Sequence, residues 1–339
     1  GDNIFGTGEW LSTWWRHFGR GRPLHVIGAR RPDGQLAAII PLYEAARRPL
    51  RMIRFVGHGA TDQLGPVCAV DARSTAAAAL GGLFAPGASP FRWDLALADE
   101  LPGDTQWPGT RLARRPSWVA TLAGRTGAEW SAGLSPKLRY QLAVGARRLA
   151  ERGPVRYRNT SHAGEVAADL DRFLALHEVR WAGVGGSRSF AGRREFHHDF
   201  AAQAFARGWL RLHFLEVDGE AVAALYNVRF AGVESTYQAS RDPAFDRCSV
   251  GLLLNAHAIR SAADDGLCDY RFLRGDEPYK RRFADRDAGL QTVAWTNGRV
   301  GDLALGVVRH VPSLSRKARR RVPAPYAWDT GGSPRWSRP

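Results

Sequence analysis

Trp209-Leu-Arg-Leu-His-Phe-Leu-Glu-Val-Asp-Gly-Glu-Ala-Val-Ala-Ala-Leu-Tyr-Asn-Val-Arg-Phe230 is the most regular stretch of this 339-residue sequence. Asp218-Gly219 divides it into two apolar runs, and Ala231-Gly232 precedes a third run at 233–239. Short turns of this kind are typical of β-hairpins, because Asp and Gly tolerate the positive φ angles that a two-residue turn requires. The sequence therefore predicts a three-stranded antiparallel meander.

The residues after the meander predict a helix and two further strands. The helix is expected at about 249–265, because Gly266 is a typical helix terminator. A short apolar strand is expected at 268–273 and a last strand at 291–296, before the Asn297-Gly298 turn. Antiparallel strands followed by a helix and more strands indicate an α+β (mixed α/β) fold instead of a doubly wound sheet.

The N-terminal part of the chain gives a separate set of signals. A Trp-rich amphipathic start is followed by apolar strands at 24–29 and 36–43, which indicates a small α/β unit. The glycine-rich loop at 57–65 carries Asp62 and lacks phosphate-loop spacing. Two interpretations of this loop stay open, a binding loop and a tight connector.

Charge and composition indicate a folded protein with an anionic partner. The net charge is +15, and the sequence is 44% hydrophobic and 10% aromatic. The basic run Arg316-Lys-Ala-Arg-Arg-Arg321 lies among prolines and glycines, which is typical of a disordered extension. We therefore expect three parts: an N-terminal domain at 1–118, a catalytic domain at 119–311 and a basic disordered tail at 312–339.

The cysteines and the hydropathy pattern suggest a location in the cell. Cys68, Cys248 and Cys268 are far apart and fit neither a disulfide framework nor a metal pattern, which favours a reducing compartment. The longest apolar stretch is well below the ~20 residues that a membrane helix needs, and the N-terminus lacks a signal-peptide layout. We expect a cytoplasmic protein with no membrane span; the sequence gives no signal for an oligomeric state.

Two helices are predicted before the meander. Ser135 and Pro136 suit the start of a helix that should run to about Arg152. Its basic residues form either a solvated face or an anion-binding surface. In the next helix, at about 164–182, His177 lies on the apolar side, which favours a packed histidine over a general base.

The start of the helix after the meander is a candidate phosphate site. A helix N-terminus presents unpaired backbone N–H groups and the positive end of the helix dipole. Gly251 would let the backbone approach a ligand, Ser249 could cap the helix or donate a hydrogen bond, and Arg247 could pair with a phosphate oxygen. Every helix has such an end, so this motif is weak evidence by itself.

The segment 269–280 contains many polar and charged residues and follows a short apolar strand. Binding sites often form at such positions. Only three of the 48 basic residues are lysines, and one of them, Lys280, ends this segment. A carboxylate near an arginine and a lysine is held ionised, so Asp276 would be a weak base unless burial opposed that effect. A catalytic site and an ion-paired network that locks the loop are equally compatible with this pattern.

Several segments in this order resemble one known family. They are the meander together with Leu134-Ser-Pro-Lys-Leu-Arg139, Leu176-His-Glu-Val-Arg-Trp181, Ser249-Val-Gly251 and Asp269-Tyr-Arg-Phe-Leu-Arg-Gly-Asp-Glu-Pro-Tyr-Lys280. This pattern is similar to the CelD-like acyltransferases associated with cellulose biosynthesis. Those proteins belong to the GNAT superfamily of acetyl-CoA-dependent N-acetyltransferases and resemble the Fem aminoacyl-tRNA-dependent transferases. The resemblance covers about residues 5–300.

The resemblance implies a tandem GNAT-like fold, with two units built on mostly antiparallel sheets and the cofactor site in the second. Acetyl-CoA or another acyl-CoA would be the co-substrate, with no metal. Its pyrophosphate would lie over Arg247, Ser249, Val250 and Gly251. Arg247-Cys-Ser-Val-Gly251 departs from the usual superfamily motif, which is Arg or Gln, two residues, Gly, one residue, then Gly or Ala.

The mechanism implied is direct attack of a substrate amine on the thioester carbonyl. Asp276 is expected to be the base or to orient the amine, Tyr279 to protonate the thiolate, and Lys280 with Arg274 to anchor anions. The acceptor would be a small-molecule or sugar amine, and the expected substrate-binding residues are Asp62, His177, Arg180, Trp181, Tyr237 and Arg274.

Two other functions remain open. An aminoacyl-tRNA-dependent transferase of the Fem type would use the same fold, and its tRNA partner would account for the positive charge. A non-enzymatic binder of nucleic acid or another polyanion would need only the charge, but it would leave the segment 269–280 unexplained.

Overall fold

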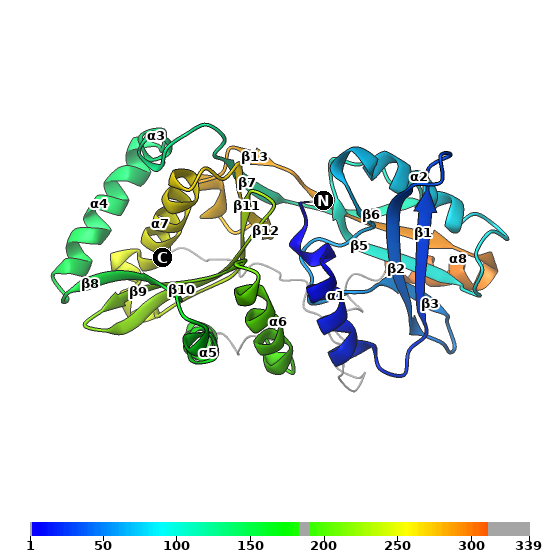
Figure 1. Ribbon diagram of the computed structural model, residues 1–339, viewed down its shortest axis with the longest axis horizontal. Coiled ribbons are helices and arrows are strands. Elements are labelled where there is room, and N and C mark those ends of the chain that lie inside the picture. Colours follow the sequence, from blue (N-terminus) through cyan, green and yellow to red (C-terminus); the bar gives the residue numbers. More distant parts are fainter. Residues whose placement is uncertain (1, 183–189, 311–339) are drawn as a thin grey trace. The chain divides into compact units, whose positions relative to one another are not determined.

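Two compact units, each built on a seven-stranded sheet, make up the computed structural model, which describes residues 2–182 and 190–310 (Figure 1). Within this part of the chain, the first unit contains residues 3–116 and 288–310, and the second contains Asp2 and residues 117–287. The predicted end of the second domain at 311 is wrong, because the strand expected at 291–296 pairs with strands of the first unit. The predicted tail at 312–339 lies outside the described residues.

The first unit has a mixed sheet in the order β1-β2-β3-β5-β14-β6, with β4 paired to β2. Its elements are α1 (Gly8–Trp14), β1 (Leu24–Arg30), β2 (Leu36–Ala46), β3 (Met52–Phe55), β4 (Val67–Cys68), α2 (Arg73–Leu83), β5 (Leu95–Pro102), β6 (Thr110–Arg115), β14 (Leu290–Thr296) and α8 (Gly298–His310). The predicted strands at 24–29 and 36–43 are confirmed as β1 and β2.

Both faces of this sheet carry a core. Successive side chains of a strand point to opposite faces. Ala96 of β5 therefore packs in the cluster that contains Leu80 of α2, whereas the neighbouring Leu95 packs in the cluster that contains Leu305 of α8. One helix thus covers each face of the central strand.

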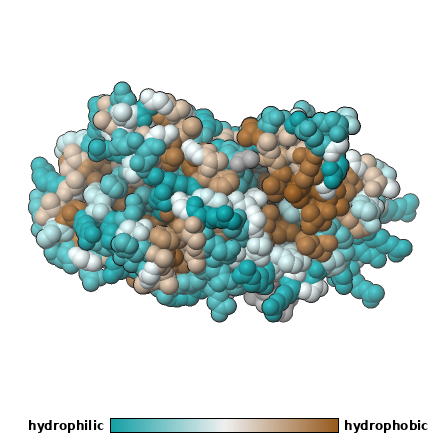
Figure 2. All heavy atoms as spheres, viewed as in Figure 1, coloured by the Kyte–Doolittle hydropathy of each residue, from teal (hydrophilic) through white to brown (hydrophobic). Residues whose placement is uncertain are grey.

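The outer part of the first unit leaves apolar side chains exposed. Leu24 and Val26 of the edge strand β1 and Leu36 of β2 are 45%, 57% and 52% exposed. Figure 2 shows hydrophobic atoms gathered over the part of this unit where β1 and β2 lie. In residues 2–182 and 190–310, no helix combines the length and apolar character needed to cross a membrane.

The second unit has the strand order β13-β7-β12-β11-β10-β9-β8. Its elements are β7 (Ser117–Thr121), α3 (Gly127–Ala132), α4 (Pro136–Ala150), β8 (Val155–Asn159), α5 (Val166–Ala182), α6 (Arg194–Ala206), β9 (Leu210–Val217), β10 (Glu220–Phe230), β11 (Val233–Arg241), α7 (Val250–Asp264), β12 (Asp269–Arg274) and β13 (Arg286–Asp287). The predicted meander is confirmed as β9, β10 and β11, which pair antiparallel in sequence order.

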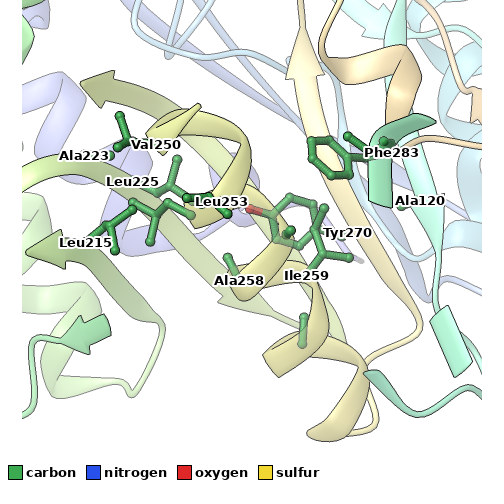
Figure 3. Packing of buried hydrophobic residues seen from close by; sticks show 14 of the residues in the cluster. Ala120, Leu215, Ala223, Leu225, Val250, Leu253, Ala258, Ile259, Tyr270 and Phe283 are labelled. Atoms are coloured by element: carbon green, nitrogen blue, oxygen red, sulfur yellow. The ribbon is translucent and has the colours of Figure 1, made fainter. Parts of the chain in front are cut away.

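Helices lie on both sides of the second sheet (Figure 1). On one side, Leu253 and Ile259 of α7 face Leu215 and Leu225 of the sheet and the ring of Tyr270 (Figure 3). On the other side, α5 packs on β10 and β11 and also contacts α6. The expected fold class is confirmed, because both units combine helices with mixed, mostly antiparallel sheets.

β11 and β12 pair in parallel for only three residues and then separate. The ladder joins Val233 to Asp269, Glu234 to Tyr270 and Ser235 to Arg271. β11 continues to Arg241 and β12 to Arg274, without further ladder pairs between them in the described chain. We call the separated segments, residues 236–241 of β11 and 272–274 of β12, the fork.

A buried polar network joins four strands at the base of the fork. Nε2 of His213 lies 2.9 Å from Oε1 of Glu234, and Nδ2 of Asn227 donates to the same oxygen at 2.6 Å. Asn227 also donates to the Tyr270 hydroxyl at 3.0 Å, and the Thr236 hydroxyl lies 2.7 Å from it. All five side chains are fully or almost fully buried. These bonds fix the positions of β9 to β12 where the ladder ends.

Glu234 makes stability depend on pH. Burial raises the pKa of this carboxyl group, but His213, Arg229 and Asn227 outweigh that effect and lower the pKa from its reference value of 4.5 to about 2. A depressed pKa contributes stability above the unfolded-state pKa, and this contribution disappears as the pH falls from about 4.5 to 2. The shift corresponds to about 3 kcal/mol.

Glu234→Gln should therefore lower the free energy of unfolding at pH 7 by about 3 kcal/mol or more, because it leaves buried cationic and polar partners uncompensated. The difference from wild type should shrink as the pH is lowered toward 3. Urea unfolding at several pH values measures both effects, with Glu220→Gln, at an exposed position of β10, as the control. A difference that stays constant with pH would show that Glu234 is not ionised in the folded protein.

Candidate active site at the fork

Three elements meet beside the C-terminal half of β11. From α5, Nδ1 of His177 lies 3.2 Å from the Ser240 hydroxyl, and Arg180 donates to the carbonyl oxygen of Ala239. At the end of β11, Arg241 forms a two-pronged ion pair with Asp246, at 2.6 and 3.2 Å. These contacts bring the end of α5, the fork and the segment before α7 into one region.

The start of α7 is open and is held by α4. Ser249 has φ 55° and ψ 35°, a left-handed conformation that ends the preceding turn and begins the helix. The expected capping bond from its side chain is absent; the Ser249 hydroxyl instead accepts from Nε2 of Gln141 at 3.0 Å. No described residue accepts from the N–H groups of Val250 and Gly251. Val250 is fully buried, so the N–H group of the half-buried Gly251 is the one of the two that an anion can reach.

Close packing of α4 sets this geometry. Ser135 caps α4 by accepting from the Leu138 N–H, with Pro136 in the first turn, as the sequence predicted. A Cβ atom at Gly145 would lie 2.6 Å from the Cys248 carbonyl oxygen, so only glycine lets α4 approach this closely. Arg148 of α4 also donates to the Arg247 carbonyl oxygen at 3.2 Å. The Arg247 side chain is exposed.

Asp276 does not have the environment of a general base. Its carboxylate accepts from Nε of Arg281 at 3.0 Å and from the Trp118 indole at 3.1 Å, and its side chain is 43% exposed. The hydrogen bonds from Arg281 lower the pKa of Asp276 more than its slight burial raises it. A carboxylate with a lowered pKa is a weaker proton acceptor. For Asp276, this geometry therefore favours the second of the two interpretations, an ion-paired network that fixes the loop.

Lys280 also locks the loop. Its Nζ donates to the Arg274 carbonyl oxygen at 2.7 Å and to Oε2 of Glu277 at 2.8 Å, and the residue is 5% exposed. These two bonds join the end of β12 to the turn that follows it. The Lys280 ammonium group is therefore engaged within the protein and is poorly placed to anchor a ligand, contrary to the expectation from the sequence.

Tyr279 is the predicted catalytic residue that faces the fork region. The residue is half-buried, and its ring meets Phe272 edge-on at 6.1 Å. Burial raises the pKa of its hydroxyl and the Glu277 carboxylate raises it further, whereas Arg180 and Arg241 act in the opposite direction. The hydroxyl group is thus protonated at neutral pH and lies near two guanidinium groups.

The remaining predicted substrate residues of the second unit gather around α5. His177 is 3% exposed and its ring contacts the ring of Phe173. This burial agrees with the sequence interpretation of His177 as a packed histidine. Arg180 lies over the Trp181 ring at 5.2 Å. Tyr237 is the extra residue of a β-bulge, because Asn227 and Tyr226 of β10 pair with the residues on either side of it. Bulges of this type redirect a side chain.

Asp62 belongs to the first unit and is buried there at 3% exposure. Its assignment to the substrate remains a prediction.

Sequence reasoning missed Arg241, Ser240 and Gln141. Ser240 and Arg241 directly follow the strand predicted at 233–239, which extends to Arg241 in the structure, and their position before the phosphate motif was the available signal. Gln141 lies on the predicted basic helix, where no sequence pattern distinguishes it from its neighbours. Its contacts depend on how α4 packs on α7.

Comparisons with known proteins agree with this geometry. Residues 136–281, from the start of α4 to the loop after β12, match the family model described as an acetyltransferase (GNAT) domain. No curated protein matches the chain. This match covers less than half of the chain. The second unit thus contains a segment similar to a GNAT acetyltransferase domain.

Solved structures share the fold over nearly the whole chain. FemX has 9% identity and a TM-score of 0.61, with 91% of this chain and 95% of that chain covered. A conserved protein of unknown function from Bacteroides thetaiotaomicron VPI-5482 has 11% identity and a TM-score of 0.55, with 86% and 90% covered. The C-terminal domain of a putative lysylphosphatidylglycerol synthetase from Agrobacterium fabrum has 11% identity and a TM-score of 0.53, with 88% and 90% covered. At these identities the likeness concerns the fold alone.

His177 should stay neutral well below pH 6. Burial, reinforced by the charge of Arg180, lowers the pKa of its imidazole from 6.5 to about 4. The unfolded state binds a proton first, so the contribution of this residue to stability is present above pH 6.5 and is lost as the pH falls toward 4. NMR titration of the imidazole nitrogens, assigned by loss of the signal in His177→Gln, tests this. A midpoint near 6.5 would contradict the buried geometry.

Proposed function

We propose that this protein is a CelD-like, acyl-CoA-dependent N-acyltransferase of the cytoplasm, which moves an acyl group, by default acetyl, to a small-molecule or sugar amine. The observation that carries the proposal is the fork beside the open start of α7, within the segment that matches the acetyltransferase model. In this proposal an extended ligand lies along the strands where their ladder has ended. The free N–H group of Gly251 can bind its phosphates.

The residues at the start of α7 fit a pyrophosphate group. The N–H group of the half-buried Gly251 has no partner among the described residues, and no described carboxylate pairs with the exposed Arg247 guanidinium. A Cβ atom at position 251 would already lie 3.4 Å from Cδ of Arg241, so glycine keeps this turn accessible. The donor set is therefore a backbone N–H group plus one guanidinium, and the Ser249 hydroxyl, which accepts from Gln141, keeps its own proton to donate.

The reaction needs a new C–N bond, cleavage of the C–S bond and transfer of one proton to the departing thiolate. Tyr279 can perform the last task, because its hydroxyl is protonated at neutral pH, but its raised pKa makes it a weaker acid. Arg180 and Arg241 lie close enough to offset this effect, because they stabilise negative charge at this hydroxyl as it releases its proton. The amine, attacking as the free base, loses one proton as the amide forms; this proton returns through solvent to the Tyr279 oxygen, so the role first expected of Asp276 is not required.

The second candidate function is a Fem-type aminoacyl-tRNA-dependent transferase. The fold shared with FemX and the net charge of +15 favour it. The exposed basic residues of α4 offer a surface for RNA: Lys137, Arg139, Arg147 and Arg148. Salt distinguishes this function, because RNA affinity falls steeply between 50 and 200 mM salt, whereas binding of a CoA thioester in a pocket should change less.

Calorimetric titration with acetyl-CoA at moderate salt is the direct test. We expect micromolar binding that is lost in Gly251→Trp, because an indole at the first turn of α7 would cover the N–H group at this position. Gly164→Trp is the matched control, since a side chain at that glycine meets open space. No binding to acetyl-CoA, together with salt-sensitive binding to aminoacyl-tRNA, would replace the proposal with the Fem-type function.

Tyr279→Phe should lower kcat about 100-fold and leave the KM for acyl-CoA nearly unchanged, because only the proton donor is removed. Steady-state assays with acetyl-CoA and an accepted amine measure both constants. Tyr140→Phe removes a hydroxyl from a 73% exposed tyrosine of α4 and serves as the control. Full turnover in Tyr279→Phe would remove Tyr279 from the mechanism.

A further inference from the structure

Arg180 stands apart from two other cations near the fork, because each of those has a carboxylate partner. Asp246 is paired with Arg241, with contacts of 2.6 and 3.2 Å, and Glu277 is paired with Lys280 at 2.8 Å. In the part of the chain that the structure describes, Arg180 has no carboxylate within 4 Å. Arg180 is therefore a guanidinium group with no direct ion-pair partner among the described residues.

Arg180 is held in place but keeps donors to spare. One of its N–H groups donates to the Ala239 carbonyl oxygen, and its guanidinium plane lies 5.2 Å from the Trp181 ring centre. A guanidinium group has five N–H donors and stays charged at any pH at which proteins fold. Because Arg180 is half-buried, water compensates its charge only in part.

The neighbouring titratable side chains, His177 and Tyr279, do not compensate the positive charge of Arg180. His177 is neutral at pH 7, since burial and Arg180 lower its pKa to about 4. Tyr279 is also neutral, since burial and Glu277 raise the pKa of its hydroxyl. Neither group therefore supplies a negative charge to Arg180. A ligand group with one negative charge would be its ion-pair partner.

We infer that the acceptor amine carries an anionic group, a carboxylate in the first instance, which Arg180 binds next to the reacting nitrogen. This inference rests on the proposed acyltransferase function and names the substrate class of that site. The donor phosphates have their own partners, the Gly251 N–H group and Arg247, on a different element from Arg180. A guanidinium group binds a carboxylate through two parallel N–H···O bonds, so Arg180 would orient the acceptor as well as attract it.

Pairs of amines that differ only in the anionic group test the inference. β-Alanine is compared with β-alaninamide, each at equal concentration of free amine, and O-phosphoethanolamine forms a third arm that separates a carboxylate from a phosphate. The wild-type protein should show a lower KM for an anionic amine than for the amide. Arg180→Gln should raise the KM for that amine roughly 10- to 100-fold, the usual effect of losing a charge-assisted hydrogen bond.

The same variant should leave the KM for acetyl-CoA and for the amide unchanged, while kcat falls for both kinds of amine, because Arg180 also stabilises charge at the Tyr279 hydroxyl. Arg194→Gln is the matched control, because Arg194 is an exposed arginine of α6 paired with Asp171. An increase in the KM for acetyl-CoA in Arg180→Gln would assign Arg180 to the donor and overturn the inference. A wild-type preference for the amide over both anionic amines would do the same.

A binding measurement separates this inference from the proposed function. Propionate, which has no amine, is titrated into wild type and Arg180→Gln at constant ionic strength. Arg180-dependent propionate binding without acyl transfer to any amine would reject the proposed function and keep the anion site. Acyl transfer with an equal KM for the anionic amine in the two proteins, without Arg180-dependent propionate binding, would keep the function and reject the anion site.

Discussion

The early end of the β11–β12 ladder is the constraint on which the second unit depends. A parallel pair in the middle of a sheet normally continues along its length, because unpaired backbone groups inside a protein are costly. Here pairing stops after three residues, and other groups take the place of the missing ladder bonds. Arg180 donates to the Ala239 carbonyl oxygen of β11, and Lys280 donates to the Arg274 carbonyl oxygen of β12, which stays paired with β7 on its other edge. The sheet can therefore open without losing all of its polar contacts.

The buried network at the base of the fork explains why the opening begins at a fixed residue. Thr236 and Tyr270, from the two separating strands, meet through their hydroxyl groups at 2.7 Å. Asn227 connects Tyr270 to the carboxylate of Glu234, and His213 carries the connection to β9. A buried carboxylate of this kind must keep its partners, since losing one leaves an uncompensated charge. This requirement holds four strands in register next to a region with no ladder of its own.

Local chemistry identified the polar segment after β12 but not the role of each side chain. Asp276, Tyr279 and Lys280 are close in sequence, yet their surroundings differ. Asp276 is exposed and bound to Arg281, Lys280 is buried and bound to the Arg274 carbonyl oxygen, and only Tyr279 meets cations from other elements. Which of the three can transfer a proton depends on burial and on partners from α5 and β11. A sequence pattern carries no information about either.

The sequence by itself determined the local elements of this protein, because turns, caps and apolar periodicity are properties of neighbouring residues. It gave the meander, the α4 cap at Ser135 and the α+β class. It misplaced β14, because the choice between two sheets depends on long-range pairing with β5 and β6. The tertiary structure alone decided that Gln141 holds Ser249 and that Arg180 lacks a carboxylate partner among the described residues. Both facts arise from contacts between helices and strands that are distant in the chain.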